Sequence, residues 1–386
     1  MARPLDALVE ARMTPRERCD PVSASEHCDI AVIGAGPAGA CAALAAARAG
    51  ARVVLVERAA FPRAKVCGCC LAASGIAALA SAGAGDALAG ATPLRAIRVT
   101  NGARAMTLRR EAGVAIGRED LDARLVDIAR RAGAEIRFET SARIEPDGLL
   151  ALTRGERVST LKARTVIVAD GLQGGALDGV PGFEWRIAPR SMMGFGTLLP
   201  ASALECPSGE IHMHVGRDGY IGVVRLPSGA LDVAAAVLPA ALRRAGSVAD
   251  CARALLADVA HDPDAVARAR WRGTPQLTRT RARIAAPGIL VAGDAAGYIE
   301  PFTGEGMSWG IATGLAAGEL AARDADAHVS WPARHAALVA QPKWRCRAIA
   351  LLLRSPALVA AALAVGSRMP RPFESLAARL EGAVSP

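Results

Sequence analysis

A glycine-rich turn between two apolar runs constrains this chain more than any other feature. The run 29–33 leads into Gly34-Ala35-Gly36-Pro37-Ala38-Gly39, and small apolar residues then precede a second apolar run at 53–56. This pattern predicts a strand, a tight turn, a helix and a second strand. The first glycine permits the turn, the second lets the backbone approach a pyrophosphate, and the third lets the helix pack on the strand. We therefore expect a dinucleotide phosphate site at a helix N-terminus, formed by Gly34, Gly36, Pro37, Ala38 and Gly39.

An acidic residue stands where such a fold needs one. Glu57 follows Gly39 by 18 residues and ends the second apolar run. A carboxylate at the end of this strand can accept hydrogen bonds from both hydroxyls of a ribose. The spacing therefore supports a bound dinucleotide rather than a ligand-free turn.

A second glycine-containing loop occurs far along the chain. Gly293 and Asp294 directly follow the apolar run 288–292, and a small-residue helix is predicted to continue to Gly318. The aspartate can bond a ribityl hydroxyl, and a turn at a helix start exposes backbone N–H groups toward the carbonyl edge of a flavin. A nicotinamide dehydrogenase has no need of this loop, so the two loops together indicate FAD. The turn is expected to contribute Gly304, Glu305, Gly306 and Met307.

The segments expected to bind FAD are interrupted in the sequence. Apolar spacing predicts a helix over 118–132 and strands at 135–138, 165–169 and 288–292. Alternating polarity with Gly and Pro turns predicts strands within 97–109 and 187–237, and a helix is predicted over 248–269. We expect an α/β fold with a discontinuous Rossmann-like FAD-binding domain and an antiparallel-sheet substrate domain. The expected boundaries are a flexible leader at 1–28, the FAD-binding domain at 29–80, 115–180 and 285–330, the substrate domain at 81–114 and 181–284, and a C-terminal helical segment at 331–386.

Five motifs in this order resemble the flavoproteins of the para-hydroxybenzoate hydroxylase fold and, within that fold, the geranylgeranyl reductase branch. They are the first glycine loop with Glu57-Arg58, Lys65-x-Cys67-Gly68-x-x-Leu71, Arg118-x-x-Leu121-Asp122, Ala169-Asp170-Gly171, and Gly293-Asp294 through Gly306. The resemblance implies that Arg118 contacts the FAD and that Lys65 to Gly68 lie near the isoalloxazine ring. It also implies that Asp170 and Gly171 belong to a loop that serves both flavin and nicotinamide.

Two functions remain open at this point. The leading interpretation is a geranylgeranyl reductase-like oxidoreductase of a lipid, isoprenoid or polyketide-like molecule, with the flavin reduced by NAD(P)H or a small electron carrier. The alternative is an FAD-dependent monooxygenase of an aromatic or polyketide-type substrate, using NAD(P)H and O2. Polyprenyl reductases usually carry Tyr-x-Trp-x-Phe-Pro where this chain has Tyr220-Ile-Gly-Val-Val-Arg-Leu-Pro227, and aromatic hydroxylases usually carry His where it has Gly297. A halogenase is less favoured because Trp-x-Trp-x-Ile-Pro is missing, and so is a flavin-binding protein without turnover.

The candidate catalytic residues are few because the flavin supplies the electrons. In an alkene reduction, Cys67 or Tyr220 is the candidate proton donor. Cys67, Cys69 and Cys70 form a cluster, but no second Cys or His pair stands at zinc-like spacing. His212 and His214 share one predicted strand face without an evident third ligand. We therefore expect no metal.

The charge pattern restricts the partners. The net charge of +9 comes almost entirely from Arg, and basic runs interleaved with aromatic residues are missing, so we expect no nucleic acid. Residues 331–386 hold eight Arg or Lys against two acidic residues, which predicts contact with a membrane surface or a carrier protein. The apolar stretch 348–366 contains Arg354 and Pro356, so we expect a buried helix pair or an interfacial helix rather than a membrane span. Nine scattered cysteines without a disulfide framework indicate the cytoplasm.

Overall fold

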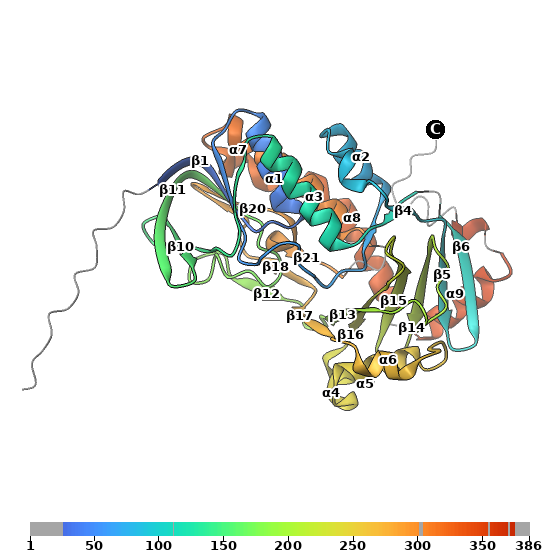
Figure 1. The fold of residues 1–386 in the computed structure, drawn as a ribbon. Helices are drawn as coiled ribbons and strands as arrows, with labels where there is room; N and C mark the ends of the chain where they lie inside the picture. Colours follow the sequence, from blue (N-terminus) through green and yellow to red (C-terminus); the bar gives the residue numbers. More distant parts are fainter. Residues whose placement is uncertain (1–25, 111, 301–303, 354–355, 370, 375–386) are drawn as a thin grey trace, which may run out of the picture.

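The computed structural model describes residues 26–110, 112–300, 304–353, 356–369 and 371–374. These residues form two packed bodies, one around an eight-stranded sheet and one around a seven-stranded sheet (Figure 1). Most of the predicted leader, residues 301–303 just before the predicted turn, and residues 375–386 of the predicted C-terminal segment lie outside the described residues.

The eight-stranded sheet is built on five parallel strands in the spatial order β20-β11-β1-β2-β8, to which β19 and the β9–β10 hairpin add antiparallel pairs. Ile30 and Val32 of β1 face one core cluster, whereas Ala31 and Ile33 face another on the opposite side. A strand that is buried on both faces needs an unbroken apolar run, which explains the pattern seen in the sequence. The bounds are β1 (Glu26–Ile33), β2 (Val53–Val56), β8 (Glu135–Arg137), β9 (Ser141–Ile144), β10 (Leu150–Arg154), β11 (Arg157–Val168), β19 (Ala285–Ala286) and β20 (Ile289–Val291).

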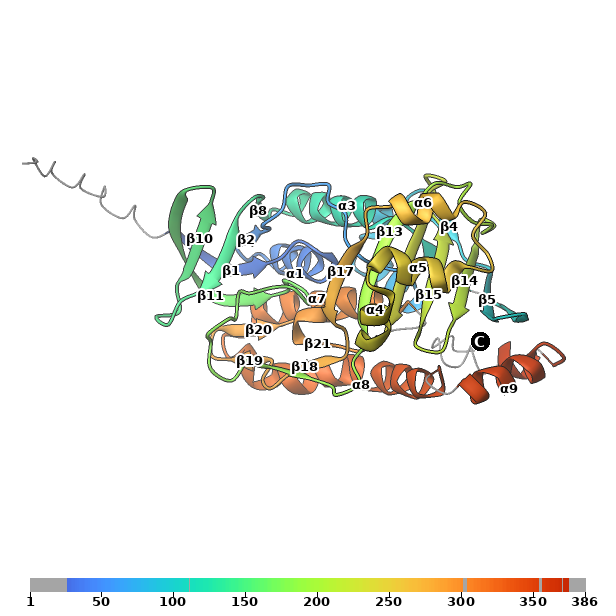
Figure 2. The same cartoon turned by 90° about the horizontal axis from the view of Figure 1, so that it is seen from below.

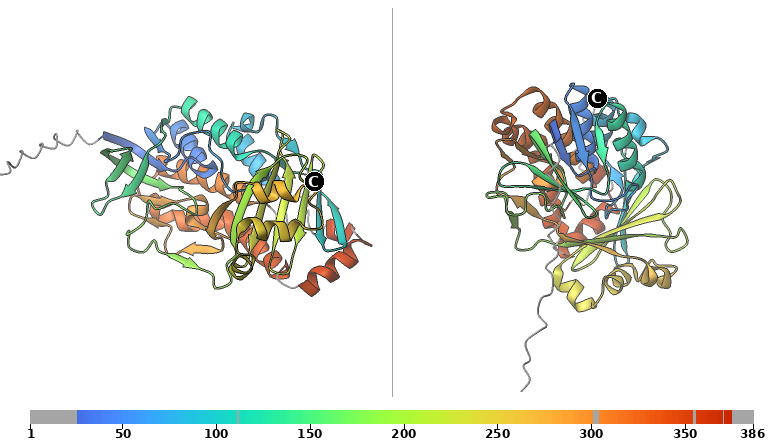
Figure 3. Two further views of the ribbon diagram at one scale, coloured as in Figure 1. Left: turned by 60° about the horizontal axis from the view of Figure 1, so that its bottom comes forward. Right: turned by 60° about the vertical axis from the view of Figure 1, so that its left-hand side comes forward.

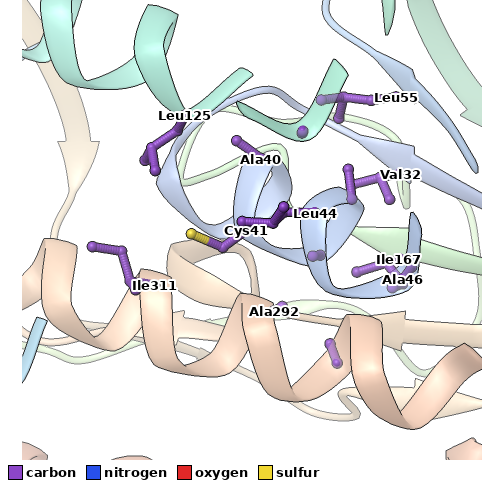
Figure 4. Packing of buried hydrophobic residues seen from close by; sticks show 14 of the residues in the cluster. Val32, Ala40, Cys41, Leu44, Ala46, Leu55, Leu125, Ile167, Ala292 and Ile311 are labelled. Carbon is purple, nitrogen blue, oxygen red and sulfur yellow. The ribbon is translucent and has the colours of Figure 1, made fainter. Parts of the chain in front are cut away.

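One face of this sheet is covered by α1 (Pro37–Arg48), with α3 (Arg118–Arg131) and α7 (Gly306–Arg323) packed against α1. Figure 4 shows the contact, where Ala40, Cys41 and Leu44 of α1 lie among side chains from the sheet and the neighbouring helices. The discontinuous FAD-binding fold predicted from the sequence is thereby confirmed. Its segments are distant in the chain but adjacent in space.

The two helices α1 and α7 approach each other unusually closely. A Cβ atom added at Gly314 would overlap the carbonyl oxygen of Ala38, and one added at Gly318 would overlap that of Ala42. Glycine is therefore needed at these positions because the backbone of the partner helix occupies the space of a side chain.

The seven-stranded sheet has the order β17-β13-β16-β15-β14-β5-β6 and is antiparallel except where β14 pairs with β5. Figures 2 and 3 show three short helices on its outer face, away from the FAD-binding body. The bounds are β5 (Ala96–Asn101), β6 (Arg104–Arg109), β13 (Met193–Leu199), β14 (Glu210–Val215), β15 (Gly219–Arg225), β16 (Leu231–Val237), β17 (Arg272–Gln276), α4 (Pro239–Ala245), α5 (Val248–Leu256) and α6 (Pro263–Arg268).

The predicted helix over 248–269 is wrong as a single element, because the chain forms α5 and α6 with a break between them. Pro263 has no N–H group to continue a helix, and it stands at the first turn of α6. Asp262 caps that helix by accepting a hydrogen bond from the backbone N–H of Ala265 at 2.8 Å. The Asp-Pro pair at 262–263 was the signal for this break in the sequence.

Two of the expected boundaries also shift. Residues 26–28, assigned to the leader, belong to β1, and the C-terminal helices begin at residue 327 rather than 331.

Two three-stranded sheets complete the fold, in the orders β3-β7-β4 and β12-β18-β21. The bounds are β3 (Cys70–Leu71), β4 (Thr92–Pro93), β7 (Val114–Ala115), β12 (Trp185–Ile187), β18 (Arg279–Arg281), β21 (Gly297–Tyr298), α2 (Ala73–Ser81), η1 (Gly85–Leu88) and η2 (Gly293–Ala296).

The C-terminal helices α8 (Ala327–Leu353) and α9 (Pro356–Gly366) run along both bodies (Figure 2). Trp331 of α8 is fully buried, and its indole N–H donates to the carbonyl oxygen of Val291 at 2.9 Å. The helix α9 lies against β5 and β6. Across the described part of the chain, no helix combines the length and the apolar character that crossing a membrane requires.

We predict that Gly318→Ala destabilises the fold although Gly310→Ala in the same helix does not. Ala is intrinsically favoured over Gly in a helix by about 1 kcal/mol, and a Cβ at Gly310 would meet only ordinary contacts with Ala38. At Gly318 the added methyl forces α1 and α7 apart, which costs about 1–3 kcal/mol. Urea unfolding followed by circular dichroism measures both. Equal midpoints for the two variants would contradict the close contact.

Candidate active site

A cavity of about 1150 Å³ lies between the two bodies. The N-terminal ends of α1 and α7, the loops after β1, β2 and β11, and the inner face of the seven-stranded sheet line it. This volume exceeds the roughly 300–1,000 Å³ of a pocket for one small ligand. The cavity can therefore hold a large ligand together with a second, smaller one.

The first glycine loop opens onto this cavity. A Cβ at Gly36 would meet only the guanidinium groups of Arg118 and Arg63, at 3.6 and 3.7 Å, so the backbone there is accessible. Gly34 has φ +98°, and a Cβ on it would lie 2.6 Å from the carbonyl oxygen of Ala169. Gly39 packs against the carbonyl of Gly34 and does not line the cavity, unlike the other four residues predicted for this loop.

Glu57 is buried in the cavity wall, and its carboxylate is firmly held. It accepts hydrogen bonds from the backbone N–H groups of Ala35 and Ala59, both at 3.0 Å. Arg63 pairs with Glu57 at 3.3 Å and with Asp122 at 3.5 Å. The analysis of the sequence missed Arg63, because an arginine in an irregular loop carries no local signal.

Arg118, at the start of α3, lies beside the same loop. Its guanidinium makes two parallel hydrogen bonds of 2.8 Å to the carboxylate of Asp122. Asp122 is one helical turn further along α3, so the Arg-x-x-Leu-Asp spacing directly produces this pair. Arg58 lines the cavity as well and donates to the carbonyl oxygen of Gln173 at 3.4 Å.

Lys65, Asp170 and Gly171 meet in the middle of the cavity wall. Lys65 Nζ occupies the space next to Gly171, 2.9 Å from where a Cβ would stand. The Oδ2 atom of Asp170 accepts a hydrogen bond from the backbone N–H of Ala176 at 3.0 Å. Burial raises the pKa of Asp170 and lowers the pKa of Lys65.

The second glycine loop reaches the cavity from the other side of α1. Gly293 packs on Ala38 and donates its N–H to the Thr313 hydroxyl at 3.1 Å, so it joins the two loops without lining the cavity. Asp294 lines the cavity, and burial raises its pKa. Gly304, Gly306 and Met307 line it at the N-terminus of α7, whereas Glu305 is buried behind them.

The cysteine cluster forms another part of the wall. Cys67 and Gly68 line the cavity, and the side chain of Cys67 hydrogen-bonds with those of Cys69 and Arg118. The hydrogen bond from Cys69 and the positive charge of Arg118 lower the pKa of Cys67 to about 6, although burial opposes this shift. This shift favours the thiolate form of Cys67. The proton-donor role of Cys67 stays a prediction.

The opposite wall is apolar and belongs to the seven-stranded sheet. It consists of side chains from β14, β15 and β16 and from the loop after β17, namely Ile211, Met213, Tyr220, Val224, Ala236 and Leu277. The candidate catalytic residue Tyr220 lies in this wall. The cavity thus has a charged side next to the glycine loops and an apolar side below them.

The histidines at 212 and 214 have local partners. His212 pairs with Glu210 at 2.9 Å, and the Nδ1 atom of His214 lies 2.8 Å from the hydroxyl of Thr100. Among the residues described, no group of three or more His, Cys, Asp or Glu has the arrangement of a metal site.

The residues present fit FAD on three observations. The N-termini of α1 and α7 both point at the cavity, and neither is capped by a side chain. The backbone at Gly36 leaves room for a phosphate between two guanidinium groups. Buried atoms of the wall, Asp170 Oδ1 and Arg63 Nε, have no hydrogen-bond partner among the described residues. Pyrophosphate and hydroxyl groups of FAD would satisfy all of these.

We predict that Gly36→Ala leaves the fold intact and abolishes stable FAD binding. The methyl group fits beside Arg118 and Arg63 in the free protein, but it occupies the space through which the backbone approaches a phosphate. FAD affinity should fall at least about a hundredfold, or roughly 2.7 kcal/mol. FAD titration of the apoprotein measures this, with Gly85→Ala as a control because no atom lies near a Cβ there. A yellow Gly36→Ala protein with full FAD content would remove Gly36 from the pyrophosphate site.

Comparisons with known proteins agree with this site. The chain is 27% identical over 371 residues to a menaquinone reductase of Mycobacterium tuberculosis, covering 87% of this chain and 86% of the relative. It is also 27% identical over 323 residues to a digeranylgeranylglycerophospholipid reductase of Methanoculleus marisnigri, with 76% of each chain covered.

Solved structures share the fold over most of the chain. A flavoprotein/dehydrogenase from Cytophaga hutchinsonii is 20% identical with a TM-score of 0.78, covering 92% of this chain and 93% of that chain. A geranylgeranyl bacteriochlorophyll reductase-like protein from Thermoplasma acidophilum is 19% identical with a TM-score of 0.68, covering 86% and 87%. A flavin-dependent brominase is 14% identical with a TM-score of 0.77, covering 92% and 94%. The fold is therefore common to enzymes of different chemistry.

The model of the FAD binding domain family matches residues 27–322, which is most of the chain. The resemblance to the hydroxylase fold and its geranylgeranyl reductase branch is confirmed by this match and by the relatives. The chain therefore belongs to the FAD binding domain family and is an FAD-dependent oxidoreductase of the hydroxylase fold.

Proposed function

We propose that this enzyme reduces an apolar substrate that carries a polyprenyl chain, such as an isoprenoid lipid or a prenylated quinone. The observation that carries this proposal is the apolar wall of the cavity on the seven-stranded sheet. The names of the two relatives, a menaquinone reductase and a digeranylgeranylglycerophospholipid reductase, support the same substrate class.

The wall fits a flexible aliphatic chain better than a flat aromatic ring. Met213 and Val224 project from neighbouring strands, and Met213 packs over Gly222, where a side chain would otherwise stand. The Trp and Phe usual in polyprenyl reductases are absent from the stretch 220–227, and aliphatic side chains and Met213 line the cavity there. Aliphatic side chains bury a hydrocarbon chain at about 25 cal/mol per Å² without demanding one orientation.

Bound FAD, once reduced, supplies a hydride to an acceptor atom of the substrate. The protein positions that atom and excludes water. Cys67, Gly68 and Lys65 form the wall that faces the sheet, so a substrate lying on β14 and β15 would be held between these two walls. We propose NAD(P)H or a small electron carrier as the reductant, because the cavity volume leaves room for a second ligand beside a dinucleotide.

Anaerobic half-reactions test the proposed substrate class. The FAD-loaded protein is reduced with dithionite and mixed with a short-tailed menaquinone, with digeranylgeranylglycerophospholipid, or with a tailless naphthoquinone as the control. We expect a tailed substrate to reoxidise the flavin without oxygen, at least about tenfold faster than the tailless compound, which corresponds to about 1.4 kcal/mol of tail recognition. Parallel reductions with NADH, NADPH and a reduced ferredoxin identify the donor.

Mass spectrometry then separates the possible reactions. A reduced alkene keeps two added hydrogen atoms in air, whereas a quinol returns to the quinone. Reoxidation only with oxygen, together with a product that has gained an oxygen atom, would contradict the proposal and make the enzyme a monooxygenase.

We also propose that α9 docks this enzyme on an anionic phospholipid bilayer. The inner side chains Val359 and Leu363 are buried in the same apolar cluster as Met213 and Tyr220 of the cavity wall. The helix contains no charged residue, and its outer residues Leu358 and Val365 are each 52% exposed.

The charged residues next to α9 indicate which kind of membrane surface it would bind. Arg368 and Arg371 are exposed directly after α9, next to Met369, which is 59% exposed. An apolar helix face bordered by arginines fits the interface of a bilayer that contains anionic lipids. Such docking would place the cavity wall close to a lipid reservoir.

The double variant Leu358→Ser/Val365→Ser should lose binding to phosphatidylcholine vesicles that contain phosphatidylglycerol. Each side chain contributes about 1.5 kcal/mol or more when buried, so affinity should fall about tenfold or more for each substitution. Vesicle cosedimentation measures this. Val158→Ser, at an exposed apolar residue of β11, is the matched control. Membrane docking would be refuted if the double variant binds these vesicles as well as the wild type, or if the wild type does not bind them.

A further inference from the structure

An acidic residue interrupts the apolar wall of the cavity. Asp232 lies on β16, opposite Val224 of β15 and Leu198 of β13. Its neighbours Leu231 and Val233 face the outer core beneath α5 and α6, so Asp232 faces the opposite side, where it lines the cavity. No motif of the sequence singled it out, because an aspartate within an apolar strand has the appearance of an ordinary surface position.

Asp232 is buried and incompletely satisfied. Only 6% of the residue is exposed, and its Oδ2 atom has no hydrogen-bond partner among the described residues. Its side chain hydrogen-bonds with that of Cys69. Burying a carboxyl oxygen without a hydrogen-bond partner costs free energy, roughly 1–3 kcal/mol for an unsatisfied polar atom. An unsatisfied carboxyl group that lines a cavity is a candidate for contact with a ligand.

The charges around Asp232 come from the loop 67–70 and from α3. Cys67, whose pKa is lowered, approaches it from the loop together with Cys69 and Cys70, and Arg118 approaches from the helix. Burial, followed by the negative charge of Cys67, raises the pKa of Asp232 well above its usual range. The hydrogen bond from Cys69 and the charge of Arg118 act in the opposite direction without cancelling this effect. Burial therefore favours the protonated form of this carboxyl group.

We propose that Asp232 is the catalytic acid that delivers the proton to the substrate during its reduction. This inference rests on the proposed reductase function. The substrate gains a hydride from the reduced flavin at one atom and a proton from the Asp232 carboxyl group at another. For an alkene, the π bond becomes two C–H bonds; for a quinone, the ring becomes a hydroquinone. The flavin is oxidised by two electrons, and the Asp232 carboxylate regains its proton from water.

Cys69 is the positioning residue for this acid. Its φ of +50° is rare for a residue with a side chain, and it directs the thiol to both Cys67 and Asp232. The single S–H proton of Cys69 can be donated either to Cys67 or to Asp232, and donation to the Asp232 carboxylate stabilises the form left after proton transfer. Removing that hydrogen bond should raise the pKa of Asp232 further.

Tyr220 is the rival donor, and the register separates the two groups. Both lie on the cavity face, but Tyr220 stands four residues along β15 from Val224, the partner of Asp232. At about 3.4 Å per residue, the two positions are about 14 Å apart. The two side chains therefore start from distant points of the wall, and their substitutions discriminate between them.

The test compares Asp232→Asn with Tyr220→Phe in the anaerobic half-reaction with the short-tailed menaquinone and the digeranylgeranyl lipid. Asp218→Asn, at a half-buried aspartate that pairs with Arg244 outside the cavity, is the matched control. We expect Asp232→Asn to keep its FAD and to be reduced by dithionite at the wild-type rate, while flavin oxidation by substrate slows about 10²–10⁴-fold. In the wild type this rate should fall as the pH rises through the pKa of Asp232. In Asp232→Asn that fall should vanish, and in Cys69→Ala it should move to higher pH.

Infrared spectroscopy gives a readout that needs no turnover. The wild type should show the C=O band of a protonated carboxyl group, sensitive to deuterium exchange, and Asp232→Asn should lack it. Absence of this band, or an Asp232→Asn variant that is oxidised by substrate as fast as the wild type, overturns the role of Asp232 while the reductase function stands. A wild-type protein that no apolar substrate oxidises overturns the reductase function itself. If the rate of flavin oxidation no longer falls at alkaline pH in Tyr220→Phe but still falls in Asp232→Asn, the proton comes from Tyr220.

Discussion

The close contact between α1 and α7 is the constraint on which the rest of this structure depends. Each helix begins at the cavity, and each follows one of the two glycine loops. Because Gly314 and Gly318 let the backbone of α7 lie directly on α1, the two uncapped N-termini border the same cavity. Partial positive charge at both ends then favours a single anionic ligand. A side chain at either glycine would separate the loops and remove this convergence.

The ionisable side chains on the two sides of the cavity have different surroundings. Next to the glycine loops, Glu57, Arg63, Asp122 and Arg118 form a connected set of ion pairs, so these buried charges are compensated in the free protein. On the sheet side, Asp232 interrupts an apolar wall, has no ion-pair partner within the described residues, and has a pKa that burial raises. A compensated network gives a rigid binding surface, whereas a neutral buried acid holds a transferable proton. This contrast is the physical basis for assigning the cofactor to one side and the substrate to the other.

Local patterns were sufficient for most of the FAD-binding body. The unbroken apolar runs of β1 and β2 and the glycines after them each have one physical explanation, so their prediction succeeded. The helix over 248–269 failed because apolar spacing outweighed the Asp-Pro break. Arg63 and Asp232 were missed because their significance comes from neighbours on other segments, Asp122 for the first and Cys69 for the second.

The sequence by itself determined the kind of cofactor, because sharp turns, close backbone approach and a carboxylate at a strand end are local requirements that only certain residues meet. The order of the segments along the chain also determined that the FAD-binding body is discontinuous. Only the tertiary structure decided which side chains face the cavity and which groups carry protons. Burial and Coulomb interactions depend on distances between segments that are remote in sequence, such as 67–69, 118 and 232. For that reason the two glycine loops can be recognised in the sequence, whereas the acidic residue in the apolar wall cannot.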